Sequence, residues 1–315
     1  MIPVTDAAEW AALLSRVEHP HMVQSWAYGE AKQAAGDEQT QRRVDLGGWR
    51  TRRLVIERDG EPVAICQLLD KSIAGIRCAS RINRGPLILG DPGDKVVRDV
   101  YHALRRRWRL LRGVLVLAPA LTADPANHRM LADLGFRPRK QAGWFSSRVD
   151  LRKDQEQLRA SLAPTWRNRL KASERSGLEV GVSQLPEDYE WMIERHAENM
   201  REKGFSHPAA PLVSALYRAA PDDVLILQAL LEGEAVGGMM SFLFGHGAEY
   251  YVGWMGPKGR PVNVGNFLYW QTACELQRRG CQWFDLGGQR MGATGQFKKG
   301  MRGEVYELLN EWLVF

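Results

Sequence analysis

The stretch that most constrains this chain joins a short apolar segment to two glycines and, further on, to two lysines. Residues 283–286 are mostly apolar and include an aromatic pair, which is typical of a buried strand. Gly287 and Gly288 then allow the backbone to turn sharply or to approach a ligand closely. Because ligands in α/β sheets bind beyond the carboxyl ends of strands, Lys298 or Lys299 would suit an anionic substrate or a developing oxyanion there. The same spacing also fits a hairpin with a solvated Lys-Lys tip.

Length and composition indicate a globular protein of about two domains. The chain has 315 residues, of which 44% are hydrophobic and 25% charged. A net charge of +6 favours anionic partners such as RNA, nucleotides or an acidic lipid surface. The 4 cysteines form no Cys-x-x-Cys pair, so we expect neither disulfides nor a zinc site, in a reducing cytoplasm. With no signal-peptide pattern and no apolar run of membrane-spanning length, any membrane contact is expected to be peripheral.

Strands and helices alternate in the first half of the chain. A helix capped by Thr5 or Asp6 is predicted to run to about residue 17, and a second short helix lies within 24–32. Alternating and apolar runs predict strands at 52–57, 62–70, 77–83, 113–118 and 144–151, the last of which closes this half. A short helix at 127–134 is ended by Gly135.

A strongly basic helix is predicted at residues 94–112. Its basic residues are Arg98, Arg105, Arg106, Arg107, Arg109 and Arg112. In one interpretation they form a solvated face, while Leu104, Trp108 and Leu111 form the core side. In the other interpretation the face contacts the phosphates of RNA. The sequence leaves both interpretations open.

The second half has a longer series of elements. We predict helices at 162–176, 187–203, 212–219 and 265–280, strands at 178–182 and 283–286, a three-strand meander at 224–231, 235–244 and 248–254, and a last strand at 304–315. This order resembles the GNAT acyltransferase fold, in which two central strands splay apart and a helix N-terminus points into the gap. Free N–H groups at that N-terminus receive phosphates. The usual acetyl-CoA signature, (Arg/Gln)-x-x-Gly-x-(Gly/Ala), is absent, because Arg260 and Gly265 stand at the wrong spacing.

Five short motifs, in order along nearly the whole chain, resemble those of the FemABX family of aminoacyl-tRNA-dependent peptidyltransferases. They are Gln24-Ser25-Trp26 with Lys32, Arg84-Gly85-Pro86, 166–171 with Gly177, 284–288, and 297–301. The resemblance implies an α/β (α+β) chain with two tandem GNAT-like domains at 1–150 and 151–315. Each is expected to hold a mixed, largely antiparallel sheet flanked by helices. No stretch sustains heptads, so we expect no coiled-coil arm.

The resemblance also implies the chemistry and the residues that perform it. A free amine of a nucleotide- or lipid-linked peptidoglycan-precursor peptide, or another amine, attacks the ester of an aminoacyl-tRNA and forms an amide. Lys298 matches the family lysine beside the oxyanion, with Phe297 next to it, and these two are the expected catalytic residues. Lys32, Arg84, Arg201, Tyr251, Asp285, Gly287 and Gly288 are the expected substrate-binding residues. Lys32 and Arg201 would contact acceptor phosphates, and Tyr251 would line the acceptor channel; Asp285 also fits a purely structural role.

The chain departs from the family in a second respect besides the absent coiled-coil arm. The aspartate that family members often carry after Gly-Pro, proposed as a base, is replaced by Leu89, and the nearest carboxylate is Asp91. Because the coiled-coil arm is absent, any tRNA contact is expected to come from the body of the protein, with the helices at 105–112 and 167–171 as candidates. The histidines at 21, 196, 207 and 246 show no paired metal spacing, so we expect no metal and no cofactor.

Two other functions fit the sequence. One is a GNAT-type N-acyltransferase that uses acyl-CoA or a carrier thioester. The other is a non-catalytic protein that binds RNA or a membrane surface. For the favoured function we expect a cytoplasmic monomer whose partners are aminoacyl-tRNA and the precursor, with peripheral contact at the inner membrane face as an option.

Overall fold

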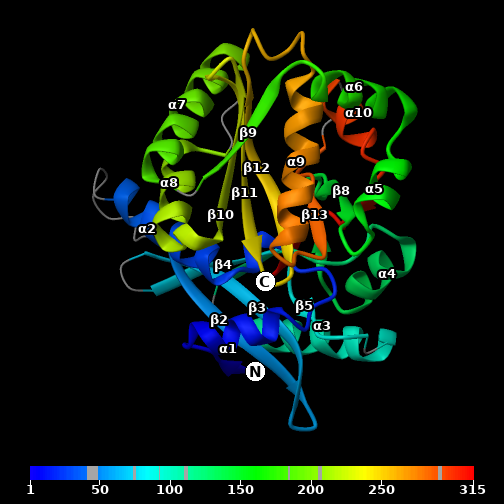
Figure 1. Cartoon of the computed structure of the whole chain (residues 1–315). Coiled ribbons are helices and arrows are strands. Elements are labelled where there is room, and N and C mark those ends of the chain that lie inside the picture. Colours follow the sequence, from blue (N-terminus) through cyan, green and yellow to red (C-terminus); the bar gives the residue numbers. More distant parts are fainter. Residues whose placement is uncertain are drawn as a thin grey trace. The chain divides into compact units, whose positions relative to one another are not determined.

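The computed structural model describes residues 1–40, 49–73, 76–91, 93–109, 113–183, 185–204, 208–289 and 293–315. The chain divides into two compact units (Figure 1). Unit 1 consists of Met1–Phe145 and Glu307–Phe315, and unit 2 consists of Ser146–Tyr306. Each unit holds a mixed, largely antiparallel sheet flanked by helices, as predicted. Division into GNAT-like domains at 1–150 and 151–315 stays a prediction.

Unit 1 is built on a sheet in the order β1-β2-β3-β4-β6-β15-β7, with β5 paired to β3. Its strands are β1 (Ile2–Pro3), β2 (Trp49–Arg58), β3 (Glu61–Ile73), β4 (Ile76–Asn83), β5 (Leu87–Ile88), β6 (Val114–Ala118), β7 (Arg137–Pro138) and β15 (Trp312–Val314). Its helices are α1 (Ala7–Leu14), the short 3-10 helix η1 (Met22–Gln24), α2 (Trp26–Thr40), α3 (Gly93–Arg109) and α4 (Pro125–Asp133). The β4–β6 pair is parallel, whereas β2–β3 and β3–β4 are antiparallel.

Helices of unit 1 cover both faces of this sheet. Successive side chains of each strand point to opposite faces, so each strand packs against helices on both sides. Leu54 and Leu68 point to one face and pack with Leu104 and Trp108 of α3 in a common core. On the opposite face, Arg53 donates hydrogen bonds to the backbone of Trp26 at 2.9 Å and to Glu30 at 2.8 Å on α2. The predicted core side of the basic helix is thus confirmed for Leu104 and Trp108; residues 110–112 lie outside the described part.

Unit 2 is built on a sheet in the order β14-β8-β13-β12-β11-β10-β9. Its strands are β8 (Phe145–Asp150), β9 (Leu178–Ser183), β10 (Val224–Leu231), β11 (Glu234–Phe244), β12 (Gly247–Met255), β13 (Trp283–Asp285) and β14 (Glu304–Glu307). Its helices are α5 (Gln155–Ser161), α6 (Pro164–Glu174), α7 (Pro186–Lys203), α8 (Ala210–Ala219), the 3-10 helix η2 (Pro221–Asp223), α9 (Val264–Arg278) and α10 (Ala293–Lys299). The predicted meander is confirmed as β10, β11 and β12.

Adjacent glycines in β11 let helices approach both faces of the unit 2 sheet. A Cβ on Gly237 would lie 2.8 Å from Val264 of α9, and one on Gly238 would lie 2.5 Å from Trp191 of α7. These distances are too short for any larger side chain, so α9 and α7 lie directly against the strand. Figure 1 shows α9 running along the strands of the meander.

Two central strands of unit 2 diverge, as the GNAT resemblance predicts. β12 and β13 run parallel and pair only over residues 247–249 and 283–285. β12 continues to Met255, whereas β13 ends at Asp285. Immediately beyond the paired segment, β12 has an extra residue relative to β11, because Met240 faces Val252 and Ser241 faces Tyr250. Tyr251 is therefore the bulged residue of β12.

Two strand predictions are corrected. The strand predicted at 144–151 to close the first half is β8, which pairs with β13 in the sheet of unit 2. The strand predicted at 304–315 is two strands, β14 in unit 2 and β15, which pairs with β6 and β7 in unit 1. Between them the backbone of Leu308 and Leu309 bonds to Trp144 and Leu121 instead, which ends the first strand.

The described helices are short. The longest, α7, has 18 residues and ends at Gly204 in the left-handed conformation. As predicted, the described residues contain no long coiled-coil arm. Nor does any helix in these parts of the chain combine the length and apolar character needed to cross a bilayer.

Candidate functional site

Lys298 is buried inside unit 2. Its side chain is only 2% exposed, whereas the adjacent Lys299 is exposed. The Nζ atom of Lys298 donates to the carbonyl oxygens of Gly287 at 3.4 Å and Gly288 at 3.2 Å. It also lies 4.8 Å from the ring centroid of Tyr250. The solvated Lys-Lys tip is thus wrong for Lys298, and the lysines stand in the last turn of helix α10 and not in an open loop.

The surroundings of Lys298 lower its pKa but leave the side chain mostly protonated at pH 7. Burial lowers the pKa of Lys298 to about 8, and the negative charges of Asp285 and Glu249 oppose this shift. The side chain is therefore mostly an ammonium at pH 7. An ammonium carries three donors, and two of them point at glycine carbonyls. Among the described residues, these two carbonyls are the hydrogen-bond acceptors of Lys298.

Asp285 holds the glycine turn in place. Its Oδ1 accepts from the hydroxyl of Ser146 at 2.6 Å and from the backbone N–H of Gly287 at 2.8 Å. Its Oδ2 accepts from the hydroxyl of Tyr306. Gly287 has a φ of +72°, and a Cβ there would lie 2.7 Å from the carbonyl oxygen of Tyr250. These contacts of Asp285 and Gly287 fix the turn, so that the carbonyls of Gly287 and Gly288 face the ammonium of Lys298.

Phe297 joins the lysine helix to α6 and α9. Its ring lies 5.9 Å from that of Trp166 on α6 and 5.1 Å from that of Tyr269 on α9. A Cβ on Gly300 would lie 2.3 Å from Cδ1 of Trp166, so the indole packs directly on that glycine. Figure 1 shows α10 beside α6. The motifs at 166–171 and 297–301 thus meet in space.

The start of α9 differs from the expected row of free N–H groups. The N–H of Val264 bonds to the carbonyl of Gly259 at 3.0 Å, and those of Asn266 and Phe267 bond to Asn263 at 3.0 and 3.3 Å. Asn263 itself has a φ of 56°. A Cβ on Gly265, in this first turn, would be 3.5 Å from the ring of Phe297. Two N–H groups in the first turn of α9, those of Val264 and Asn266, are therefore already bonded within the chain.

Tyr250, which the sequence reasoning missed, is the tyrosine that contacts Lys298. Its ring stacks on Tyr269 at 5.2 Å, and burial raises the pKa of Tyr250 to about 12, so the phenol stays neutral. Tyr251, the predicted channel residue, instead packs edge-on against Phe242 at 5.1 Å. The bulge at Tyr251 decides which tyrosine faces the lysine, and the sequence carries no clear signal for it.

Arg201 is exposed near the end of α7, and its Nε lies 3.5 Å from the carbonyl of Ala197. No contact joins it to Lys298 among the described residues.

Gly288 is exposed, and its carbonyl accepts a hydrogen bond from Lys298. One of the two residues that accept from the buried ammonium therefore lies at the surface.

Lys32 and Arg84 belong to unit 1. Lys32 is half-buried on α2; burial first, and then the positive charge of Arg81, lowers the pKa of Lys32. The guanidinium of Arg84 lies 3.9 Å from the ring centroid of Trp144, and Arg84 has a φ of 45°. Leu89 is buried and Asp91 exposed, so Asp91 lies where solvent reaches it.

The motifs of unit 1 meet through Gln24. Its Nε2 donates to the carbonyl of Asn83 at 2.7 Å, and its Oε1 accepts from the N–H of Gln67 at 2.7 Å. A Cβ on Gly85 would lie 2.8 Å from the Gln24 amide. Gly85 is thus required because a buried glutamine packs against it, which accounts physically for two of the five motifs.

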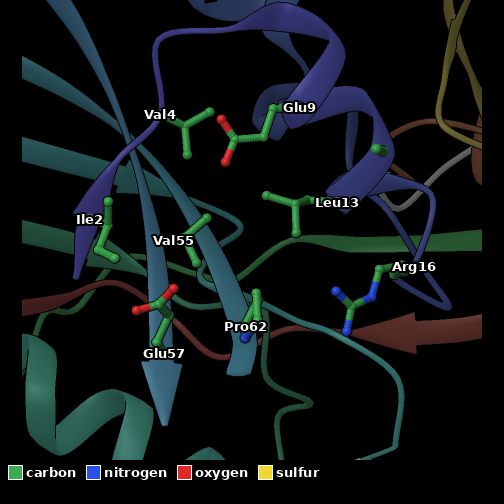
Figure 2. A pocket seen from close by; sticks show the side chains of 9 residues that line it. Ile2, Val4, Glu9, Leu13, Arg16, Val55, Glu57 and Pro62 are labelled. Carbon is green, nitrogen blue, oxygen red and sulfur yellow. The ribbon is translucent and has the colours of Figure 1, made fainter. Parts of the chain in front are cut away.

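Figure 2 shows a separate hollow on unit 1, beside α1 and the edge strand β1. Apolar side chains line most of it, including Ile2, Val4 and Val55, with Glu9 and Glu57 beside them. None of the predicted site residues lines it. In the described residues, no group of three or more His, Cys, Asp or Glu side chains is placed to hold a metal ion. His207 lies outside that part.

Residues 162–299, from the end of α5 to the end of α10, match the family model described as an acetyltransferase (GNAT) domain. The match lies within unit 2 and includes Phe297 and Lys298. The family it describes is one of acyltransferases. A search of curated proteins found no match.

Solved structures share the fold over nearly the full chain. A crystal structure of FemX superposes with a TM-score of 0.79 at 14% identity, covering 99% of this chain and 97% of that one. L-PGS from Bacillus licheniformis gives a TM-score of 0.53 at 13% identity, covering 98% and 91%. A tandem GNAT protein from the clavulanic acid pathway gives 0.52 at 13% identity, covering 99% and 97%. The chain thus has a tandem GNAT fold, and the predicted likeness to FemABX proteins is confirmed at the level of the fold.

Proposed function

We propose that this chain transfers an amino acid from the ester of an aminoacyl-tRNA to an amine, forming an amide. The observation that carries the proposal is the buried ammonium of Lys298, held by two glycine carbonyls where β12 and β13 diverge. A charged group costs free energy to bury, so a lysine at this place is better explained by chemistry than by packing. The FemX-like fold supports the same assignment.

The reaction needs a stabilised oxyanion. The neutral amine attacks the ester carbonyl carbon, a C–N bond forms, and the carbonyl oxygen takes up negative charge. The C–O bond to the tRNA ribose then breaks, and the released oxygen takes the proton that the amine gives up. Lys298 would donate its remaining N–H to the oxyanion. Tyr250, neutral and in contact with Lys298, is no base, and the general base stays unassigned.

The acceptor we propose is a nucleotide- or lipid-linked peptidoglycan-precursor peptide. Burial first, and then the charge of Arg81, which is itself paired with Glu311, lowers the pKa of Lys32, so an anion bound beside Lys32 would stabilise its charged form. We assign Lys32 to acceptor phosphates on this ground. Arg84, Arg201 and Tyr251 stay proposals for substrate contact, which their observed contacts support less directly. The protein would act as a cytoplasmic monomer.

A second candidate is N-acyl transfer from acyl-CoA, which the acetyltransferase domain match favours. Two observations weigh against it. The first amide of α9 is already bonded to Gly259, and Phe297 packs against Gly265. A pyrophosphate placed on this helix N-terminus would have to displace them.

Mass spectrometry of the product separates these candidates. The purified chain is incubated with total charged tRNA and a nucleotide-linked precursor peptide, or with acyl-CoA and the same acceptor. We expect an aminoacylated product that ribonuclease pretreatment abolishes. A product from acyl-CoA alone would establish the second candidate. No product in either arm, with RNA or vesicles bound, would establish a non-catalytic binding protein.

A further inference from the structure

A basic hollow of about 410 Å³, here called the β7 hollow, lies at the edge of the unit 1 sheet. The described residues that line it are Arg105, Ala132, Gly135, Phe136, Arg137 and Phe315. Strand β7 is the last in the sheet order, so the hollow lies at the edge where α3, the end of α4 and the end of β15 meet. Two of the lining residues are arginines and none is acidic, so the β7 hollow favours an anionic ligand.

Arg105 lines the β7 hollow from α3 and is only partly paired. Its Nε donates to the carbonyl oxygen of Gly135, the residue that follows the end of α4, at 3.3 Å. Its Nη1 atom is buried and has no hydrogen-bond partner among the described residues. A buried donor without a partner costs free energy, so an acceptor that reached this guanidinium would stabilise it. No ion pair of Arg105 is recorded in the described part of the chain.

Arg137 stands beside an exposed aromatic ring. It is the cross-strand partner of Leu313, and Phe315 follows Leu313 by two residues, so Arg137 and Phe315 share a face. The guanidinium of Arg137 lies 5.8 Å from the ring centroid of Phe315. Both side chains are exposed, and the described residues supply no recorded ion pair for Arg137. An open aromatic ring next to a cation is typical of protein surfaces on which nucleic-acid bases stack.

The positive charge continues along α3. Arg98, His102 and Arg105 recur at spacings of four and three residues, so they lie along one side of the helix. Arg98 and His102 are exposed, and no ion pair of Arg98 is recorded where the structure describes the chain. From Arg98 to Arg105 the helix rises about 10 Å, the length of about three stacked nucleotides. A strand of nucleic acid would follow the helix into the β7 hollow, whereas a free nucleotide would use the hollow alone.

We propose that the β7 hollow and this side of α3 bind a single strand of RNA. Phosphates pair with Arg105 and Arg137, and one base stacks on Phe315. The identity of the strand rests on the proposed function, because the donor of that reaction is a tRNA. A lipid surface fits less well, since the aromatic ring lines a hollow and a lipid surface favours apolar side chains that project.

Fluorescence anisotropy with uncharged tRNA and with a short single-stranded RNA tests the proposal apart from catalysis. The affinity of the full chain is measured at several salt concentrations, and we expect both RNAs to bind. R105Q/R137Q should weaken binding on the order of tenfold and make the fall of log K with log salt concentration shallower by about 1.4, the share of two phosphates. F315A should weaken binding on the order of tenfold through lost stacking and leave that slope unchanged.

Matched variants keep the test decisive. R129Q removes an exposed arginine of α4 that does not line the β7 hollow, and it should bind RNA as the wild type does. R105K/R137K keeps both charges and F315W keeps an aromatic ring, so these variants should regain most of the lost affinity, which a folding defect cannot imitate.

Two sets of results would overturn the proposal. One is an unchanged RNA affinity in R105Q/R137Q and F315A, whether or not the chain transfers amino acids. The other is a different ligand: AMP that binds as tightly as the short RNA, or phosphatidylglycerol vesicles that bind while RNA does not. RNA binding with the expected losses, in a chain that forms no amide, would support this proposal and contradict the proposed function alone.

Discussion

At the scale of the residue, Lys298 is a buried cation whose use depends on retaining its proton. Its folded pKa of about 8 lies below the usual 10.5, because burial outweighs the attraction of Asp285 and Glu249. Below pH 8 the folded and unfolded chains both hold this proton, so burial of the charge costs stability. Between pH 8 and pH 10.5 only the unfolded chain holds this proton, so the free energy of unfolding rises with pH over this range.

This sign gives a prediction for Lys298→Met, which keeps the length of the side chain but cannot ionise. The free energy of unfolding of the wild type, minus that of the variant, should rise by roughly 1 kcal/mol per pH unit between pH 8 and 10. Urea unfolding followed at intervals of pH measures it, and other titrating groups cancel in the difference. A flat difference over that range would mean that the pKa of Lys298 is not lowered.

At the scale of the element, α10 is held by its neighbours more than by its own sequence. A seven-residue helix with an internal glycine is too short to be stable alone. The indole of Trp166 packs on Gly300 just after the helix, and Phe297 packs between α6 and α9. The position and orientation of Lys298 therefore depend on packing between helices that are far apart in the sequence.

Gly300→Ala tests this dependence. The new Cβ would stand 2.3 Å from Trp166, so the indole or α10 must shift. We expect a loss of about 1–3 kcal/mol in the free energy of unfolding, together with reduced turnover. Gly181→Ala, where the nearest atom would be 4.0 Å away, is the control and should change stability by about 0.5 kcal/mol or less. Similar losses in both variants would contradict the proposed packing.

Sequence patterns predicted where helices and strands lie better than they predicted which residues and elements contact one another. The meander and the strand predicted at 283–286, which is β13, follow from local periodicity and are confirmed. The core side of the basic helix is confirmed for Leu104 and Trp108. Whether Tyr250 or Tyr251 faces Lys298 depends on a one-residue bulge, which periodicity cannot locate. The helix α10 was missed because long-range packing stabilises it. The roles of the predicted site residues stay predictions until they are tested by activity.

At the scale of the whole molecule, the chain passes between its units twice near the ends of strands. β8, from the first half, belongs to the sheet of unit 2, and β15, from the end of the chain, belongs to the sheet of unit 1. Such pairings join residues that are far apart in sequence, so no local signal predicts them. Unit 1 therefore needs the last residues of the chain to complete its sheet.

Trp312→Ala tests this requirement. Trp312 on β15 is fully buried and stands edge-on to His128 with ring centroids 4.8 Å apart. We expect unit 1 to lose about 3–5 kcal/mol, seen in hydrogen exchange as lost protection in β6 while β11 stays protected. Phe315→Ala, 60% exposed, is the matched control and should leave both unchanged. Equal loss of protection in β6 and β11 would show that the two units unfold together.

The central claim is that the ammonium of Lys298 stabilises the oxyanion of acyl transfer, and a single-turnover rate tests it most directly. Charged tRNA is mixed with excess enzyme and acceptor, and amide formation is timed for the wild type, Lys298→Met and Lys299→Met. We predict a rate lower on the order of a hundredfold for Lys298→Met and an unchanged rate for Lys299→Met, whose side chain is exposed. A Lys298→Met enzyme as fast as the wild type would contradict the account.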